Sequence, residues 1–164
     1  MIVYATKLTV KKAAVGLLAL AAVIWGVSAL SAHGADAASA AAEAGLSQKL
    51  ATNEARVEFL QSYGWEVEET PTTETEVRIP DTFDAAYEEY NALQRKQGLD
   101  LEKYKGRKAM LYVYSVLNDP SGEEGVTASL VLYRNRLIAA DICSAQADGF
   151  IHGVTEKTNQ NQQE

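Results

Sequence analysis

The hydrophobic pattern of the chain opens with a long apolar run, Ala13–Leu30, which contains no charged side chain. A helix needs roughly 20 apolar residues to cross the ~30 Å hydrocarbon core of a bilayer, so the run is at the short end of what spans one. Three lysines precede it within residues 1–12, and no further Lys or Arg occurs before Lys49. Because short basic flanks stay in the cytoplasm, the pattern predicts a single-pass anchor at 13–30, a cytoplasmic segment at 1–12 and an extracellular remainder.

A secretory signal peptide has the same order of charges and is the alternative interpretation of this run. Its apolar core usually covers about 7–15 residues and ends at a small-x-small cleavage site. The run in this chain is longer, which favours an uncleaved anchor, but Ala35-Asp36-Ala37 offers such a cleavage site. Cleavage after Ala37 would release a secreted protein.

Beyond residues 31–52, an Ala-rich stretch that we interpret as a tether, apolar positions at three- and four-residue steps predict two helices. The first covers residues 53–63, with Asn53 as its N-cap and Gly64 as its stop. The second covers residues 81–97 and ends before Gly98. Its stripe consists of Phe83, Ala86, Tyr87, Tyr90, Leu93 and Gln97.

Alternating apolar and polar positions predict strands at 65–69, 76–79, 109–117, 126–133 and 136–143. Arg134-Asn135 fits a tight hairpin turn between the last two strands, because Asn tolerates the positive φ that such turns need. The economical packing is an α+β domain at 53–154, with one antiparallel sheet of four to five strands and two helices packed on one face. The polar tail 155–164 is predicted to be disordered.

Charge and cysteine content narrow the class of protein. The 164-residue chain has a formal net charge of −7, and its predicted cytoplasmic flank is basic. The exported part is therefore more acidic still and should repel nucleic acid, so we expect no nucleic-acid partner. Cys143 is the only cysteine, which excludes an intramolecular disulfide. An exported domain without disulfides fits the envelope of a Gram-positive bacterium.

Three side chains are the candidates for binding. Asp141 falls inside the apolar strand stretch 137–142, and a carboxylate there must be paired or face solvent. It is a candidate ligand contact if that sheet face is open. Tyr112 and Tyr114 share one face of their strand and form a candidate binding platform on the same condition.

A catalytic interpretation needs Asp141 to act with Cys143 or His152, in the manner of a thiol nucleophile with a base and an orienting carboxylate. A cysteine at the end of a strand is more often a buried apolar residue, so we predict no catalytic residues. His33 lies in the tether, which leaves His152 without partners for a metal triad. No metal site or cofactor is expected.

The chain resembles a family of small exported domains of Gram-positive bacteria, the domain of unknown function family 4830. The resemblance covers about residues 53–154 and is carried, in order, by 56–60, 63–67, Ile79-Pro80, Phe83, Tyr87, Tyr90-Asn91, Leu93-Gln94, 97–101, 104–106, 141–144 and 149–153. It implies a single N-terminal membrane segment. The family has no established activity, so the resemblance implies no catalytic residues.

These observations predict a non-enzymatic, membrane-tethered extracytoplasmic module that binds an envelope protein or peptide and contacts the membrane through Ala13–Leu30. Recognition would use an open sheet face or an edge strand that adds a partner strand by backbone pairing. The alternatives are a small envelope hydrolase that uses Asp141 with Cys143 or His152, and a structural spacer without a ligand.

Overall fold

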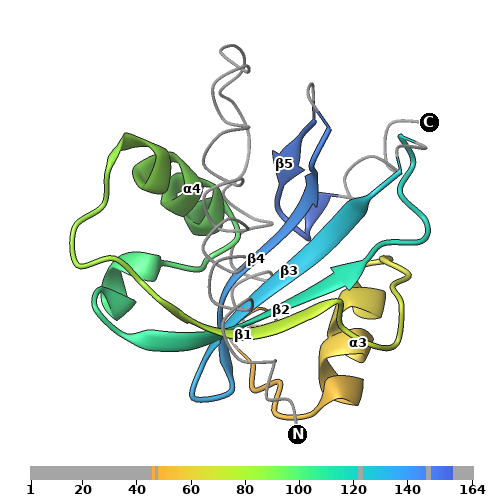
Figure 1. Ribbon diagram of the computed structural model, residues 1–164, viewed down its shortest axis with the longest axis horizontal. Coiled ribbons are helices and arrows are strands. Elements are labelled where there is room, and N and C mark those ends of the chain that lie inside the picture. The colour runs from red at the N-terminus through yellow and green to blue at the C-terminus, as the bar shows by residue number, and fades with distance from the viewer. Residues whose placement is uncertain (1–45, 47, 122–123, 147–148, 157–164) are drawn as a thin grey trace, which may run out of the picture.

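The computed structural model describes residues 46, 48–121, 124–146 and 149–156, and Figure 1 shows their arrangement. The predicted anchor 13–30 lies outside these residues, as do most of the tether and nearly all of the tail. Within the described part, no helix is long and apolar enough to span a bilayer. The elements are α3 (Asn53–Ser62), β1 (Thr73–Arg78), α4 (Ala85–Lys96), the 3₁₀ turn η2 (Leu101–Tyr104), β2 (Lys108–Ser115), β3 (Val126–Tyr133), β4 (Arg136–Ser144) and β5 (Ile151–His152).

The predicted α+β class with one antiparallel sheet is confirmed. The five strands lie in the order β1-β2-β3-β4-β5, and every neighbouring pair is antiparallel. Arg134 and Asn135 join β3 to β4 with φ of 51° and 64°. Two successive positive φ values match the twist of a two-residue hairpin, as expected from the asparagine.

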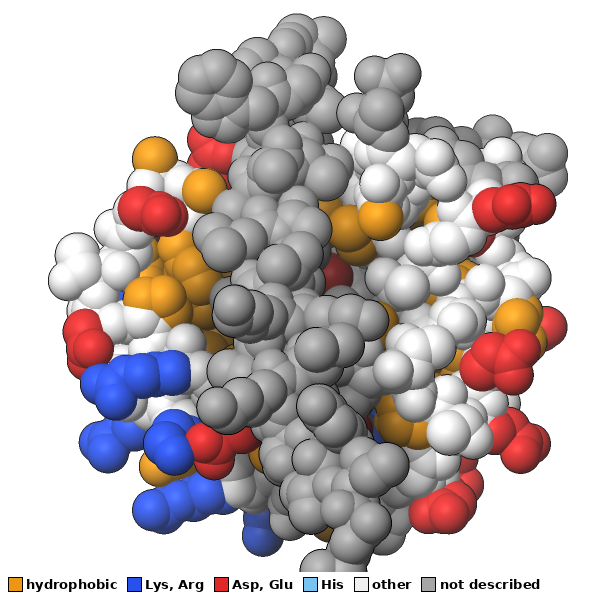
Figure 2. Space-filling model, viewed as in Figure 1, with side chains coloured by type: hydrophobic (Ala, Val, Ile, Leu, Met, Phe, Trp, Pro, Cys, Tyr) orange, Lys and Arg blue, Asp and Glu red, His pale blue; other side chains and the backbone are white. Residues whose placement is uncertain are grey.

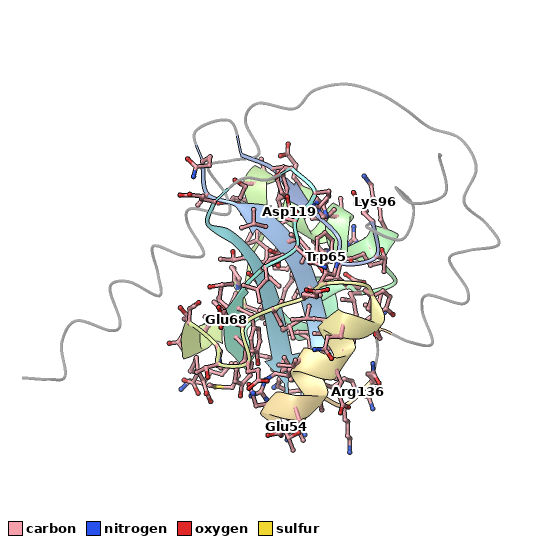
Figure 3. The ribbon with its side chains drawn as sticks, turned by 90° about the vertical axis from the view of Figure 1, so that its right-hand side faces the viewer. Glu54, Trp65, Glu68, Lys96, Asp119 and Arg136 are labelled. Atoms are coloured by element: carbon pink, nitrogen blue, oxygen red, sulfur yellow. The ribbon has the colours of Figure 1, made fainter. Side chains whose placement is uncertain are left out.

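The prediction that both helices pack on one face of the sheet is wrong. Side chains of α3 pack with Tyr112 and Leu130, whereas Tyr87 and Tyr90 of α4 pack with Val131. Leu130 and Val131 are consecutive in β3, so they point to opposite faces. Figure 3 accordingly shows α3 in front of the sheet with α4 behind it.

The physical reason for the two-sided arrangement lies in the central strands. Both Leu130 and Val131 are buried, as are nearly all residues of β3 and β4. A strand with apolar residues at odd and even positions must bury both faces. A layer of helix on each face satisfies this requirement, and a single two-helix layer does not.

The α3 side of the core also recruits residues from outside the predicted domain. Leu46 and Leu50, which fall in the predicted tether, are fully or almost fully buried in it. Leu50 N–H donates a 2.8 Å hydrogen bond to the Asn135 carbonyl at the hairpin. The folded domain therefore begins before residue 53. At its other end, Trp65 Nε1 donates a 2.7 Å hydrogen bond to the carbonyl of the buried Val154.

The capping side chains determine where the two helices begin. Thr52, and not Asn53, caps α3 by accepting a hydrogen bond from Ala55 N–H at 3.2 Å. Asp84 caps α4 by accepting from Tyr87 N–H at 2.8 Å. The second helix therefore begins at residue 85 and not at 81.

The strand predictions differ mainly at the edges of the sheet. The predicted strand 65–69 contributes a single bridge, from Val67 to Val116. The predicted strand 76–79 is the longer β1, and β5 was not predicted. A two-residue strand has too few positions to show alternation, which explains why β5 left no pattern.

Charged side chains are distributed unevenly over the surface. Figure 2 shows Lys and Arg side chains gathered at the lower left of the displayed face, whereas Asp and Glu dominate its right margin. The negative net charge of the chain is therefore not spread evenly over this face.

Candidate functional site

Asp141 lies in β4 on the face that α4 covers, and its residue is fully buried. The Tyr90 hydroxyl of α4 donates a 2.6 Å hydrogen bond to Asp141 Oδ1. Ser129 stands directly opposite Asp141 on β3, and its hydroxyl also stabilises the ionised form of the Asp141 carboxyl group. Asp141 Oδ2 has no hydrogen-bond partner among the described residues. Asp141 is thus paired, as a charge in an apolar strand must be, but its face of the sheet is closed by α4.

The pKa of the Asp141 carboxyl group lies close to neutral pH. Burial raises its pKa to about 7, and the hydrogen bonds from Tyr90 and Ser129 offset only part of that effect. Within the described part of the chain, no Lys or Arg contributes to its pKa. Burial, followed by the neighbouring carboxylate, raises the pKa of Tyr90 well above 10. Tyr90 therefore stays a neutral donor, and Asp141 is the group of this pair that titrates.

Cys143 lies on the same face of β4 as Asp141, two residues further along. It is buried, and burial together with the Asp141 charge raises its pKa to about 11. Its Sγ lies 3.6 Å from the Ser144 carbonyl oxygen. The side chain is thus a protonated thiol, which is a poor nucleophile.

His152 faces the other side of the sheet. In the ladder between β4 and β5 it stands opposite Ile142, whereas Cys143 stands opposite Ile151. Its ring stacks on Phe150, with centroids 5.1 Å apart, and its Nδ1 lies 3.0 Å from the Gly153 carbonyl oxygen. Asp141, Cys143 and His152 therefore do not assemble into the catalytic set of the hydrolase alternative.

Tyr112 and Tyr114 are core residues and not an open platform. Both are buried beneath α3, with Tyr114 fully inaccessible. The Arg56 guanidinium lies 3.7 Å from the centroid of the Tyr112 ring, and its Nε donates a 2.8 Å hydrogen bond to the Tyr114 hydroxyl. That hydroxyl donates in turn to Asn53 Oδ1 at 3.0 Å. The two tyrosines hold α3 on the sheet.

Two glutamines outside the predicted binding candidates close one edge of the sheet. Ala140 N–H donates a 2.9 Å hydrogen bond to Gln94 Oε1, and Gln97 Nε2 donates a 2.8 Å bond to the Ala140 carbonyl. Gln97 Nε2 also donates to Gln94 Oε1 at 3.1 Å. The side-chain amides thus occupy the outer edge of β4 beyond the two-residue β5, in the place of a neighbouring strand.

The opposite edge of the sheet, formed by β1, is open as far as the described residues show. β1 pairs with β2 on one side, and its other side has no strand partner among the described residues. Ile79 N–H donates to the Arg107 carbonyl at 2.9 Å, so the odd-numbered residues direct their backbone groups toward β2. The backbone N–H and C=O of Glu74, Glu76 and Arg78 therefore point outward. All three residues are exposed.

The described residues contain no group of three or more His, Cys, Asp or Glu that could hold a metal ion. A family model described as Domain of unknown function (DUF4830) matches residues 59–142, which extend from α3 to the Asp141 region of β4. Comparison with curated proteins and with solved structures found no significant match.

Proposed function

The chain belongs to the Domain of unknown function (DUF4830) family, and on that premise we propose that it is a membrane-tethered, extracytoplasmic interaction module of the cell envelope. Its β1 edge takes up an extended segment of a partner protein by backbone pairing. The domain is a non-enzymatic adaptor in this proposal, and the anchor Ala13–Leu30 keeps it at the outer surface of the membrane.

The observation that carries this proposal is the open edge of β1. Three outward N–H and C=O pairs, at Glu74, Glu76 and Arg78, lie along a six-residue strand. Unpaired strand edges of this kind template the addition of another strand. The other edge is covered by Gln94 and Gln97, so β1 is where the described sheet can accept one.

Other modes of recognition have less support. Both sheet faces are covered, and the tyrosines of the expected platform lie in the core. The thiol of Cys143 is protonated and His152 lies on the other face, so the hydrolase alternative has less support. Backbone pairing at the edge is the mode that needs no open face.

The experiment is crosslinking in living cells with the full-length chain and a C-terminal tag. A Glu76→Pro variant removes one outward N–H, and prolines are tolerated at strand edges. Glu76→Ala is the matched control, because it removes the same side chain and keeps the N–H. We expect Glu76→Pro to lose the captured protein and Glu76→Ala to retain it.

Equal capture by both variants would refute the edge mechanism. No captured protein from the intact chain would favour the structural spacer. The same samples give the mature N-terminus by mass spectrometry. A chain that retains residues 1–12 supports the tether, whereas a mature chain that starts at Ala38 would identify the secreted alternative, because it results from cleavage directly after Ala37.

A further inference from the structure

We propose that the strand accepted by β1 is β1 of a second copy of this chain, in antiparallel orientation about a two-fold axis between the two Glu76 residues. This inference rests on the proposed function of the β1 edge and names its partner. It follows from the order of charges in Thr73–Arg78, which reads Thr-Glu-Thr-Glu-Val-Arg.

The two-fold axis fixes which residues stand opposite one another. With Glu76 opposite Glu76 of the second copy, Glu74 faces Arg78 and Thr75 faces Val77, each twice by symmetry. In this register the outward backbone groups of Glu74, Glu76 and Arg78 all find partners across the interface, because opposed residues in an antiparallel ladder exchange N–H···O bonds at alternate positions.

The side chains on the α3 face suit this register. Two Glu74–Arg78 pairs oppose unlike charges, which stabilises cross-strand neighbours, whereas like charges destabilise them. The repulsion between the two Glu76 carboxylates is reduced by Lys108 of each copy, whose Nζ lies 2.7 Å from Glu76 Oε1. Arg78 also contacts Asp81 at 3.0 Å, but both side chains are largely exposed, and a guanidinium has donors for two carboxylates.

The neighbouring symmetric registers are less favourable. Moving the axis to Thr75 places Glu74 opposite Glu76 twice, so that like charges meet. Moving it to Val77 pairs Glu76 with Arg78 twice, but it places Glu74 opposite Pro80, which has no N–H to donate, so the ladder loses a backbone hydrogen bond at each end. The charges therefore disfavour the register centred on Thr75, and the proline disfavours the register centred on Val77, which leaves the register centred on Glu76.

A shared membrane strengthens such a contact. Strand addition along the short segment Glu74–Arg78 buries little apolar surface, so the pairing between free domains should be weak. Two chains anchored in one membrane meet at a raised effective concentration, which increases pairing without any new contact. The test therefore uses the full-length chain in lipid vesicles.

The first measurement is disulfide formation by a Glu76→Cys variant under mild oxidation. Opposed residues in an antiparallel pair have Cα atoms about 5.5 Å apart, within the range that a disulfide spans. We expect a covalent dimer from Glu76→Cys. Glu74→Cys is the matched control on the same face. It should give little covalent dimer, because position 74 of each copy faces Arg78 of the other copy and the two thiols are not opposite each other. The native Cys143 is buried and does not compete. Equal yields from the two variants would overturn the register.

The second measurement is a charge exchange. Glu74→Arg or Arg78→Glu alone places like charges in both symmetric pairs and should raise the dimer dissociation constant about tenfold or more. The double variant Glu74→Arg/Arg78→Glu restores unlike pairs and should recover dimerisation. This recovery separates the effect from misfolding, since the double variant carries both substitutions. Single variants that dimerise like the original chain, or a double variant that stays monomeric, would refute self-pairing.

Failure of this inference is distinguishable from failure of the proposed function. A chain that stays monomeric while Glu76→Pro loses capture of a different protein overturns self-pairing and leaves the edge mechanism in place. A monomeric chain whose capture is unaffected by Glu76→Pro overturns both.

Discussion

The hydroxyl of Tyr90 donates a 2.6 Å hydrogen bond to Asp141, and this bond joins the middle of α4 to a fully buried carboxylate in β4. No basic side chain among the described residues offsets the charge of that carboxylate. Its protonation state is therefore coupled to the attachment of α4 to the sheet.

The stability of the domain should depend on pH through Asp141. Its pKa is about 7 in the folded state, raised from 3.8 by burial. Between these values the folded state keeps a proton that the unfolded chain releases. The stabilisation that Asp141 contributes is therefore fully present below about pH 4. This stabilisation decreases by about 1.4 kcal/mol for each pH unit as the pH rises toward 7. Above pH 7, Asp141 causes no further change in stability. Denaturant unfolding from pH 5 to 8 measures the slope.

Replacing Asp141 with Asn should remove that dependence. The amide is neutral at every pH and its oxygen can accept the Tyr90 hydrogen bond. We expect Asp141→Asn to be more stable than the original chain at pH 8, and its unfolding free energy to change little between pH 5 and 7. Parallel pH profiles for the two proteins would show that Asp141 is not the titrating group.

Removing the Tyr90 hydroxyl should destabilise the domain. Tyr90→Phe leaves a buried carboxylate oxygen without its donor, at a cost of about 1–3 kcal/mol. The cost should be larger at pH 8 than at pH 5, because the charged carboxylate needs the donor more. Tyr87→Phe, one turn earlier in α4, is the matched control. A double-mutant cycle of Tyr90→Phe with Asp141→Asn isolates the pair, and a coupling energy near zero at pH 8 would count against it.

Loss of Gln94 should open the outer edge of β4. Gln94→Ala leaves Ala140 N–H without its acceptor, so its amide hydrogen should exchange faster with solvent, and unfolding should be about 1–3 kcal/mol easier. Hydrogen exchange at single-residue resolution measures the effect. Gln61→Ala, at an exposed position of α3, is the control and should leave Ala140 protected. Unchanged protection in Gln94→Ala would show that the side chain does not shield this edge.

Trp65 should secure the end of the folded domain. Trp65→Phe keeps an aromatic ring but removes the Nε1 donor, which leaves the buried Val154 carbonyl without that hydrogen bond. We expect a loss of about 1–3 kcal/mol in unfolding free energy. Limited proteolysis should also cleave near Val154 more readily than in the original chain. A resistant variant with unchanged stability would contradict this role.

The central strands were predictable because period-two alternation and the Asn135 turn are local signals. The placement of the helices was not, since it depends on both faces of β3 being buried, and a strand with apolar residues on both faces does not indicate which face a helix covers. Tyr112 and Tyr114 were correctly assigned to one face, but their burial is set by α3, which is distant in sequence.

Asp141 was identified because a charge inside an apolar strand must find a partner. That partner, Tyr90, lies 51 positions earlier, where it reads as one more member of an apolar helical stripe. Gln97 was assigned to the apolar stripe of the second helix, but neither Gln94 nor Gln97 was expected to bond to the edge of a strand. Polar side chains near the end of a helix usually face solvent, and nothing in their spacing indicates that they replace a strand.

The glutamines on Ala140 also limit how far the sheet can grow. With the β4 edge occupied by side-chain amides and β5 only two residues long, a copy added at β1 presents no long second edge to a third copy. In the proposed dimer, backbone pairing through β1 would therefore be self-terminating, so open-ended fibrils would not form.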